Sequence, residues 1–278
     1  MPSPTPNLLT EHSGPIFTIT LNREEKLNAM SASFLLDLKA ALDSVRFDDR
    51  ISVVVLKATG KAFTTGYDLD GGDWILSQNP VATGGKLNLD RDREDIKAIL
   101  EYWWTMWKFP KPIIAQVQGL CLSGGGELIA MCDLVVAAET AKFGHPAGRD
   151  LGIPPTVFLW PMLIGMKKTR EFLYTARLFS AAEAERLGLV NQVVPLSTLD
   201  ATVDALAADI ARTPVNNLAI LKQATSRFYE NMGLFASGDQ AAELDAVFHQ
   251  SETFVSFFAR AAEDGVQAAL AARRKRFG

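Results

Sequence analysis

The spacing of hydrophobic positions changes repeatedly along this chain, and the changes predict alternating strands and helices. Residues 15–21 alternate between apolar and polar side chains and are rich in β-forming residues, which is typical of a strand. Ser31 is a suitable N-cap for the amphipathic helix that follows. Residues 51–57, 112–118 and 133–138 are short apolar runs that predict buried strands. This strand–helix–strand order predicts an α/β layered fold.

Two stretches depart from this alternation. Residues 71–93 contain two Gly-Gly pairs and an Asn-Pro, and predict a long loop or partial helix. Such a loop is either a lid or binding loop, or a surface insertion without a role. From about residue 200 the pattern is almost wholly helical, ending in one long helix from about residue 240 toward residue 274. We therefore expect a core over residues 1–200, whose residues 1–12 form a loose tail, and a helical region over residues 201–278.

Four aromatic side chains fall within two turns of the helix predicted over residues 95–109. We interpret them mainly as core or subunit packing, with a substrate wall as the alternative. These side chains are Tyr102, Trp103, Trp104 and Trp107.

Composition excludes several classes of function. The 278 residues include 28 Lys and Arg against 32 Asp and Glu, so no basic excess favours nucleic acid as a partner. The two cysteines, Cys121 and Cys132, give no disulfide framework and favour a reducing compartment. Three scattered histidines argue against a structural metal cluster. The chain starts without a signal-peptide pattern, and no apolar run reaches the ~18 residues that span a bilayer. We expect a cytoplasmic protein without a membrane partner.

A run of three glycines, residues 124–126, follows a predicted strand and comes where a helix is expected to begin, near Gly126. Ile129 stands where a dinucleotide-binding motif needs its last glycine, and neither a phosphate-binding loop nor a serine-hydrolase elbow is present. Bare backbone amides at a helix N-terminus suit a developing oxyanion. Glu127, in the first turn, is either an acid/base catalyst or a charge that stabilises the helix end.

Four segments, in order over residues 15–195, resemble the crotonase superfamily, the enoyl-CoA hydratase/isomerase family. They read LNREEKLNAMS, GKAFTTGYDL, KPIIAQVQGLCLSGGGELIAMCDLVVAAETAKFGHP and AAEAERLGLVNQVVP. The resemblance implies a crotonase-like spiral of ββα units with a C-terminal helical trimerisation region. It also implies homotrimers or homohexamers and an acyl-CoA substrate of the kind used in fatty acid metabolism. Coenzyme A would be part of the substrate, and no further cofactor or metal is expected.

The resemblance also implies roles for individual positions. The backbone N–H groups of Tyr67 and Gly124 correspond to the two donors that hold the thioester oxygen, and Glu127 corresponds to an acid/base. The positions expected beside the CoA ester are Lys26, Ala62, Gly66, Asp68 and Leu69.

One departure from the family pattern bears on the reaction. The hydratases of the family carry a second glutamate after Phe-Gly-x-Pro, and here that position is Ala147. Two carboxylates allow one to activate water while the other delivers a proton. Asp150 is the best replacement acid by residue type. The other candidates nearby are His145, Arg149, Asp68 and the Tyr67 side chain.

Three functions remain open on this basis. Hydration of a 2-enoyl-CoA, a lyase reaction, is the default. Glu127 alone would also serve an isomerase, a decarboxylase or a hydrolase of C–C bonds in CoA thioesters, and a catalytically weak acyl-CoA-binding protein is the third possibility. We interpret residues 254–258 as packing and the basic residues 273–276 as a helix end whose cations match the helix dipole. A contact between that basic end and CoA phosphates is the alternative.

Overall fold

The first ordered element is a hairpin that corrects one prediction. In the computed structural model, which describes residues 6–70 and 73–277, β1 (Leu8–Ser13) pairs antiparallel with β2 (Ile16–Leu21). Residues 8–12 therefore do not belong to a loose tail, while residues 1–5 lie outside the described residues. Most side chains of β1 are exposed, so backbone pairing rather than burial holds this strand. That is why the hydrophobic pattern did not predict it.

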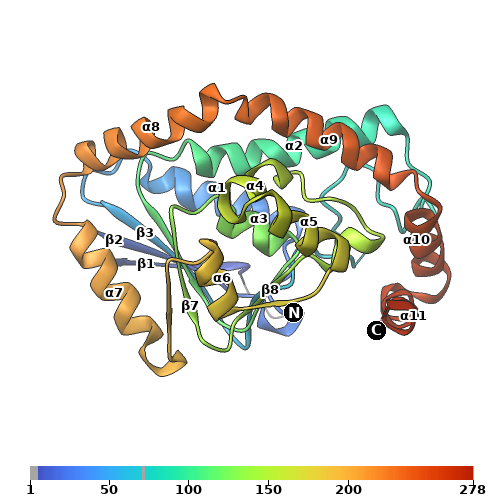
Figure 1. The fold of residues 1–278 in the computed structure, drawn as a ribbon, viewed down its shortest axis with the longest axis horizontal. Helices are drawn as coiled ribbons and strands as arrows, with labels where there is room; N and C mark the ends of the chain where they lie inside the picture. Colours follow the sequence, from blue (N-terminus) through green and yellow to red (C-terminus); the bar gives the residue numbers. More distant parts are fainter. Residues whose placement is uncertain (1–5, 71–72, 278) are drawn as a thin grey trace.

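A six-stranded sheet forms the centre of the fold (Figure 1). Its order is β1-β2-β3-β5-β7-β10, and all neighbours from β2 onward are parallel. The later strands are β3 (Val53–Ala58), β5 (Ile113–Val117), β7 (Leu134–Ala138) and β10 (Gln192–Val194). These strands are apolar because both faces of the sheet are covered.

Helices cover the two faces of this sheet. On one face, α7 (Leu199–Ile210) packs Leu199, Val203 and Ala207 against alternate residues of β3, β5 and β7. The other face belongs to the main core with α1 (Ala32–Val45) and α2 (Leu89–Trp107). Ser31 caps α1 as predicted, since its hydroxyl accepts the Phe34 N–H at 3.2 Å.

A second, four-stranded sheet has the order β4-β6-β8-β9. Its strands are β4 (Ala62–Thr64), β6 (Leu120–Leu122), β8 (Lys142–Gly144) and β9 (Phe179–Ser180). Each of β3, β5 and β7 is followed by a strand of this second sheet and then by helical structure, so the chain repeats a ββα unit as it winds. The predicted spiral fold is confirmed.

Two helices follow the last of these units, although helical hydrophobic spacing runs through both and predicts one helix. They are α4 (Trp160–Ile164) and α5 (Met166–Thr175), which are separated by Gly165 at φ 76°. The remaining short elements are η1 (Glu24–Lys26), η2 (Pro146–Arg149), η3 (Val157–Leu159), α6 (Ala181–Leu187) and η4 (Leu196–Thr198).

The helical end of the chain is divided more finely than predicted. After α8 (Val215–Asn231), the expected single helix is three: α9 (Leu234–His249), α10 (Glu252–Asp264) and α11 (Val266–Phe277). Ser251 caps α10 by accepting the Phe254 N–H at 3.3 Å, and Gly265 has φ 89°, which ends it. Figure 1 shows α8 and α9 along the upper edge and α10 with α11 at the right-hand end. None of the helices in the described part of the chain combines the length and apolar character that crossing a bilayer requires.

Candidate active site

A cavity of about 200 Å³ lies among segments that are far apart in the sequence. Its wall comes from the 65–76 segment, α2, the start of α3 (Gly124–Ala130), the 145–155 segment and the three last helices. Most of the wall is apolar. The titratable side chains in it are Tyr67, Glu127, His145, Asp245, His249 and Arg273. A mostly apolar pocket with a few convergent polar groups is typical of a small-molecule site.

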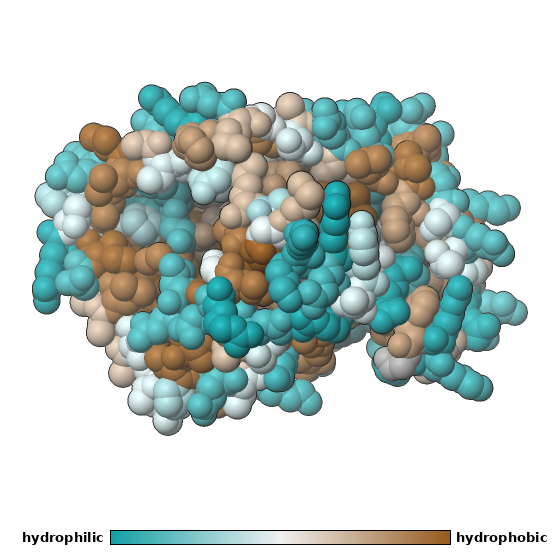
Figure 2. All heavy atoms as spheres, viewed as in Figure 1, coloured by the Kyte–Doolittle hydropathy of each residue, from teal (hydrophilic) through white to brown (hydrophobic). Residues whose placement is uncertain are grey.

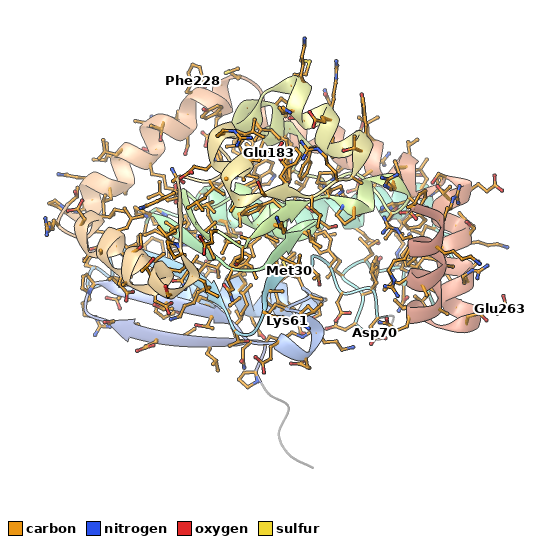
Figure 3. All side chains as sticks on the ribbon, turned by 60° about the horizontal axis from the view of Figure 1, so that its bottom comes forward. Met30, Lys61, Asp70, Glu183, Phe228 and Glu263 are labelled. Atoms are coloured by element: carbon orange, nitrogen blue, oxygen red, sulfur yellow. The ribbon has the colours of Figure 1, made fainter. Side chains whose placement is uncertain are left out.

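The Tyr67 backbone amide is available to a ligand. Met30 pairs with the segment around Tyr67: its N–H donates to the Gly66 carbonyl at 2.8 Å, and its carbonyl accepts the Asp68 N–H at 2.9 Å. Successive amides of an extended segment point to opposite sides, so the Tyr67 N–H points away from Met30. It donates no hydrogen bond to any described residue. Figure 3 shows Met30 near the middle of the molecule.

The Gly124 amide is available for a different reason. Gly124 is the first residue of α3, so its N–H has no partner within the helix. It donates to no other residue in the described ranges. Ser123 precedes it with φ 50° and ψ −117°, a conformation that costs about 1–3 kcal/mol for a residue with a side chain. This sharp turn carries the chain from β6 directly into α3 beside the cavity.

The glycine run is required by close packing as well as by the free amide. A Cβ on Gly124 would lie 2.7 Å from Met30 Cε, one on Gly125 would lie 2.7 Å from Thr64 Cγ2, and one on Gly126 would lie 2.7 Å from the Trp160 ring. At each position a side chain would make a neighbour move, and the rigid Trp160 ring beside Gly126 can move least. The helix begins at Gly124, two residues earlier than predicted.

The two turns that carry the free amides touch one another. A Cβ on Gly66 would lie 2.9 Å from the Gly124 nitrogen, and Gly66 has φ +96°, so only glycine fits there. Tyr67 and Gly124 both line the cavity. The structure therefore brings together the two amides that the sequence analysis paired.

Glu127 is buried beside these amides, with 1% of its surface exposed. Its Oε2 accepts the Thr156 hydroxyl at 3.4 Å, and its Oε1 has no hydrogen-bond partner among the described residues. Burial raises the pKa of Glu127 to about 8, and the negative charge of Asp245 adds to the rise, while the Tyr67 and Thr156 hydroxyls oppose it. At neutral pH this carboxyl group carries a proton that it can donate.

The position of the missing second glutamate is part of the wall. Ala147 lines the cavity but brings no acid. Asp150, the expected replacement, is not in the wall, because its Oδ1 pairs with Arg273 Nε at 2.7 Å. Burial raises the pKa of the Asp150 carboxyl, against the effect of Arg273. The structure therefore does not bring Asp150 into the cavity wall, and its role as the second acid stays a prediction.

The other proposed replacements do not bring a carboxylate into the cavity wall either. Asp68 pairs with Arg23 at 2.9 Å, and Arg149 donates to the Thr175 carbonyl at 2.6 Å; neither lines the cavity. His145 does line it, but burial lowers its pKa to about 4, so the ring is neutral at pH 7.

The Tyr67 hydroxyl also lines the cavity and is neutral. Burial, followed by the Glu127 charge, raises the pKa of Tyr67 well above its usual value. Its oxygen accepts the Trp103 N–H at 3.2 Å. Trp103 and Trp104 are buried, and Trp107 donates to Glu230 at 3.0 Å. None of these tryptophans lines the cavity, so the packing interpretation holds.

Of the residues expected beside the CoA ester, some lie at the cavity and others lie outside its wall. Leu69 lines the cavity, and Gly66 sets the turn before Tyr67. Ala62 is buried in β4, where its carbonyl accepts an Asn28 side-chain N–H at 2.9 Å. Lys26 is exposed and pairs with Asp70 at 2.6 Å, outside the cavity wall, so its contact with a CoA phosphate stays a prediction.

The cavity also includes residues that the sequence analysis assigned elsewhere. Phe254 and Phe258 of α10 line it, although we expected packing alone from them. Arg273, from the basic end of the chain, lies in the wall as well as pairing with Asp150. Trp74, Ile75 and Leu76 show that the 71–93 stretch contributes to the cavity; of that stretch, residues 71–72 lie outside the described residues.

Sequence reasoning missed a buried group of three titratable side chains. Asp245 and His249 lie one turn apart on α9 and both line the cavity. His249 Nδ1 lies 2.8 Å from Asp92 Oδ2, on α2, and its Nε2 lies 3.5 Å from Asp245 Oδ1. The local signal was the i, i+4 spacing of Asp245 and His249, which places both on one helix face.

Taken together, the geometry can bind a carbonyl oxygen at two amides and move a proton next to it, which is the work of an enzyme. Residues 11–256 match the enoyl-CoA hydratase/isomerase family. The chain belongs to this family.

Solved structures and a sequence relative show how far the likeness extends. An enoyl-CoA hydratase from Mycobacterium smegmatis superposes with a TM-score of 0.88 at 27% identity, covering 97% of this chain and 94% of that one. An enoyl-CoA hydratase/isomerase from Xanthobacter autotrophicus Py2 gives 0.86 at 31% identity, with 98% of each chain covered. The peroxisomal Delta(3,5)-Delta(2,4)-dienoyl-CoA isomerase of Arabidopsis thaliana is 32% identical over 201 residues, 70% of this chain and 71% of its own. Both hydratases and isomerases are thus among the similar proteins.

Proposed function

We propose that this enzyme adds water to a 2-enoyl-CoA thioester, with coenzyme A as part of the substrate and no separate cofactor. One observation carries the proposal: two free amides, of Tyr67 and Gly124, adjoin a buried carboxyl group that is protonated at neutral pH. Such a site suits a reaction in which a carbonyl oxygen gains negative charge while a neighbouring carbon gains a proton.

The proposed steps follow from this placement. The thioester oxygen accepts both N–H groups, which draws electrons from the conjugated C=C bond and makes Cβ electrophilic. Water then bonds to Cβ and gives up one proton, and the resulting enolate oxygen is held by the amides of Tyr67 and Gly124. Glu127 completes the addition by donating its proton to Cα. Each amide of such a pair contributes about 2.7–4 kcal/mol to the lowering of the barrier in comparable sites.

A screen of CoA esters tests the proposal. Purified enzyme is incubated with 2-enoyl-CoA esters of increasing chain length, and the loss of the conjugated-thioester absorbance is followed. Mass spectrometry should find a product heavier by one water. Glu127→Gln should lose at least ~10²-fold in rate while still binding the ester. Glu243→Gln, at an exposed position on α9, is the control.

The other functions predict different products. Isomerisation would leave the mass unchanged and move the double bond, and C–C hydrolysis would give two products. If an acyl-CoA raised the melting temperature but no ester were converted, the protein would be a binding protein and hydration would be excluded.

We also propose that the enzyme forms homotrimers or homohexamers. In support, α8, the Met232 that caps its C-terminal end, and α9 carry large apolar side chains that are exposed in the single chain. These are Ile220, Leu221, Phe228, Met232, Leu244 and Val247. Figure 3 shows Phe228 pointing outward from α8, and Figure 2 shows apolar groups on this face, some along the edge where α8 and α9 run. Light scattering after size-exclusion chromatography should give the mass of three or six chains; a monomer would contradict this proposal.

A further inference from the structure

We propose that Asp245 is the second acid/base of the site, and that His249 and Asp92 are positioning residues that control its charge. This inference rests on the proposed hydration, because it identifies the group that takes the proton from water. It also explains how the site works with an alanine at position 147.

Asp245 is held with one oxygen engaged and one available. Its Oδ1 accepts the Ile153 backbone N–H at 2.8 Å and faces His249 Nε2 at 3.5 Å. Its Oδ2 has no hydrogen-bond partner in the part of the chain that the structure describes. Asp245 and Glu127 line the same cavity, so a water molecule and an acyl chain there can lie between two carboxyl groups.

His249 is fixed on both sides. Asp92, which is fully buried on α2, lies 2.8 Å from Nδ1, and the Phe254 ring stacks on the imidazole at 4.4 Å and 22°. These contacts orient Nε2 toward Asp245. Although burial opposes its charge, the carboxylates of Asp245 and Asp92 raise the pKa of His249, which favours an imidazolium between two anions.

Small residues next to Asp245 and His249 leave space for their side chains. A Cβ on Gly152 would lie 2.7 Å from Asp245 Oδ1 and 3.2 Å from His249 Nε2, so a side chain at 152 would displace the pair. The small Ala147 side chain lies in the same wall. Besides Asp245 and His249, the cavity wall has four titratable side chains. They are Glu127 on α3, Tyr67 before α2, His145 in the segment after β8 and Arg273 on α11.

The environments of the two carboxyl groups separate their charge states. Burial raises the pKa of Asp245 to about 6, but the nearby His249 and the Ile153 N–H limit the rise. The pKa of Glu127 is about 8. Between these values Asp245 is ionised and can accept a proton, while Glu127 is protonated and can donate one. Carboxyl groups whose environments separate their pKa values in this way take opposite roles in acid–base catalysis.

The step then balances. Asp245 takes a proton from water as the water oxygen uses a lone pair to form the bond to Cβ. The π electrons of the C=C bond move into the enolate, whose oxygen lies at the Tyr67 and Gly124 amides. The enolate carbon takes the Glu127 proton. The product has gained one water, and the proton on Asp245 returns to Glu127 through solvent.

The first test is Asp245→Asn, which keeps an acceptor for the Ile153 N–H but cannot take a proton. We expect kcat for hydration to fall about 10²–10⁴-fold. Asp239→Asn, at an exposed position on the same helix, should keep the wild-type rate. Circular dichroism and melting temperature establish that each variant is folded. A folded Asp245→Asn variant that hydrates at the control rate would overturn the inference.

A second reaction distinguishes the role of Asp245 from that of Glu127. Exchange of the Cα hydrogen of a saturated acyl-CoA with D₂O, followed above pH 8 where Glu127 is ionised and can take that hydrogen as a proton, needs the amides and Glu127 but no attack by water. Asp245→Asn should therefore keep exchange within about threefold while losing hydration, and Glu127→Gln should lose both. Loss of exchange in Asp245→Asn would contradict the assigned division of roles. If the wild type hydrates no enoyl-CoA, the proposed function itself fails.

The positioning role has its own readout. His249→Gln removes the cation that favours the Asp245 anion, so the acid limb of the pH–rate profile should move to higher pH. Asp92→Asn should move it less, because the Asp92 charge favours the His249 cation but also raises the pKa of Asp245 directly, and the two effects oppose each other. A residue that only stabilised the fold would lower the rate without moving the acid limb of the pH–rate profile. That result would rule out the proposed positioning role of His249 and Asp92.

Discussion

Replacing Glu127 by Gln should stabilise the protein while removing its activity, and the gain should depend on pH. In the unfolded chain a glutamate ionises with a pKa of 4.5, whereas in the folded protein burial raises this pKa to about 8. Between these two pH values folding requires the carboxyl group to take up a proton. The free energy of unfolding therefore falls as pH rises through this interval.

The size of the effect follows from the interval. The free energy of unfolding falls by about 1.4 kcal/mol per pH unit. The loss reaches about 3 kcal/mol at pH 7 and about 5 kcal/mol once the pH passes 8. Glutamine has nearly the same shape and stays neutral at every pH, so the variant avoids this cost. Below the unfolded-state pKa both proteins carry a neutral side chain, and the difference there reflects hydrogen bonds such as that from Thr156.

Urea unfolding of both proteins, at one protein concentration and from pH 5 to pH 8, measures the difference. The stability gap should widen with pH by about 1.4 kcal/mol per unit. Other titrating groups act on both proteins alike and largely cancel in the comparison. A gap that stays constant over this range would show that Glu127 is ionised in the folded state, and the assignment of Glu127 as the proton donor would be refuted.

Three further predictions follow from the site. The pH profile of kcat/KM should be bell-shaped, falling below about pH 6 as Asp245 gains a proton and above about pH 8 as Glu127 loses one; a rate that still rises at pH 9 would contradict it. Gly66→Ala should lower the rate at least ~10²-fold and destabilise the fold by more than about 1 kcal/mol, because its Cβ would lie 2.9 Å from the Gly124 nitrogen at a φ of +96°. Gly14→Ala, at another positive φ but with open space around the Cβ, is the control, and equal rates in the two variants would count against a shared amide site. Asp150→Asn should keep kcat within about threefold while lowering the melting temperature, because Asp150 pairs with Arg273 outside the cavity wall; a loss of ~10²-fold or more in kcat would return Asp150 to the catalytic group.

The amide pair was predictable because its signals are local. Glycines at 66 and 124 stand in short segments whose order and spacing resemble a known family, and the structure brings those segments together. The helix ends near Ser251 and Gly265 also had local signals, a capping residue and a glycine. Helical hydrophobic spacing continues across both, however, so the pattern alone gave one helix where there are three.

The second acid was not predictable in the same way. Asp150 was chosen because it lies close to Ala147 in the sequence, but Arg273, more than 120 residues further along the chain, holds its carboxylate away from the cavity. Asp92 and His249 are separated by 157 positions and meet only because α2 packs against α9. A single sequence carries no record of such a contact, so nearness along the chain favoured Asp150 over Asp245.

The division of the C-terminal segment into α9, α10 and α11 has a consequence for biosynthesis. Phe254, Phe258 and Leu270 come from α10 and α11, yet they form part of the cavity wall. The amide turns are translated long before these walls exist. A nascent or proteolytically clipped polypeptide that ends at α9 would keep the Tyr67 and Gly124 amides and the carboxyl groups but would expose them to bulk water, so the cavity is complete only after α10 and α11 have been made.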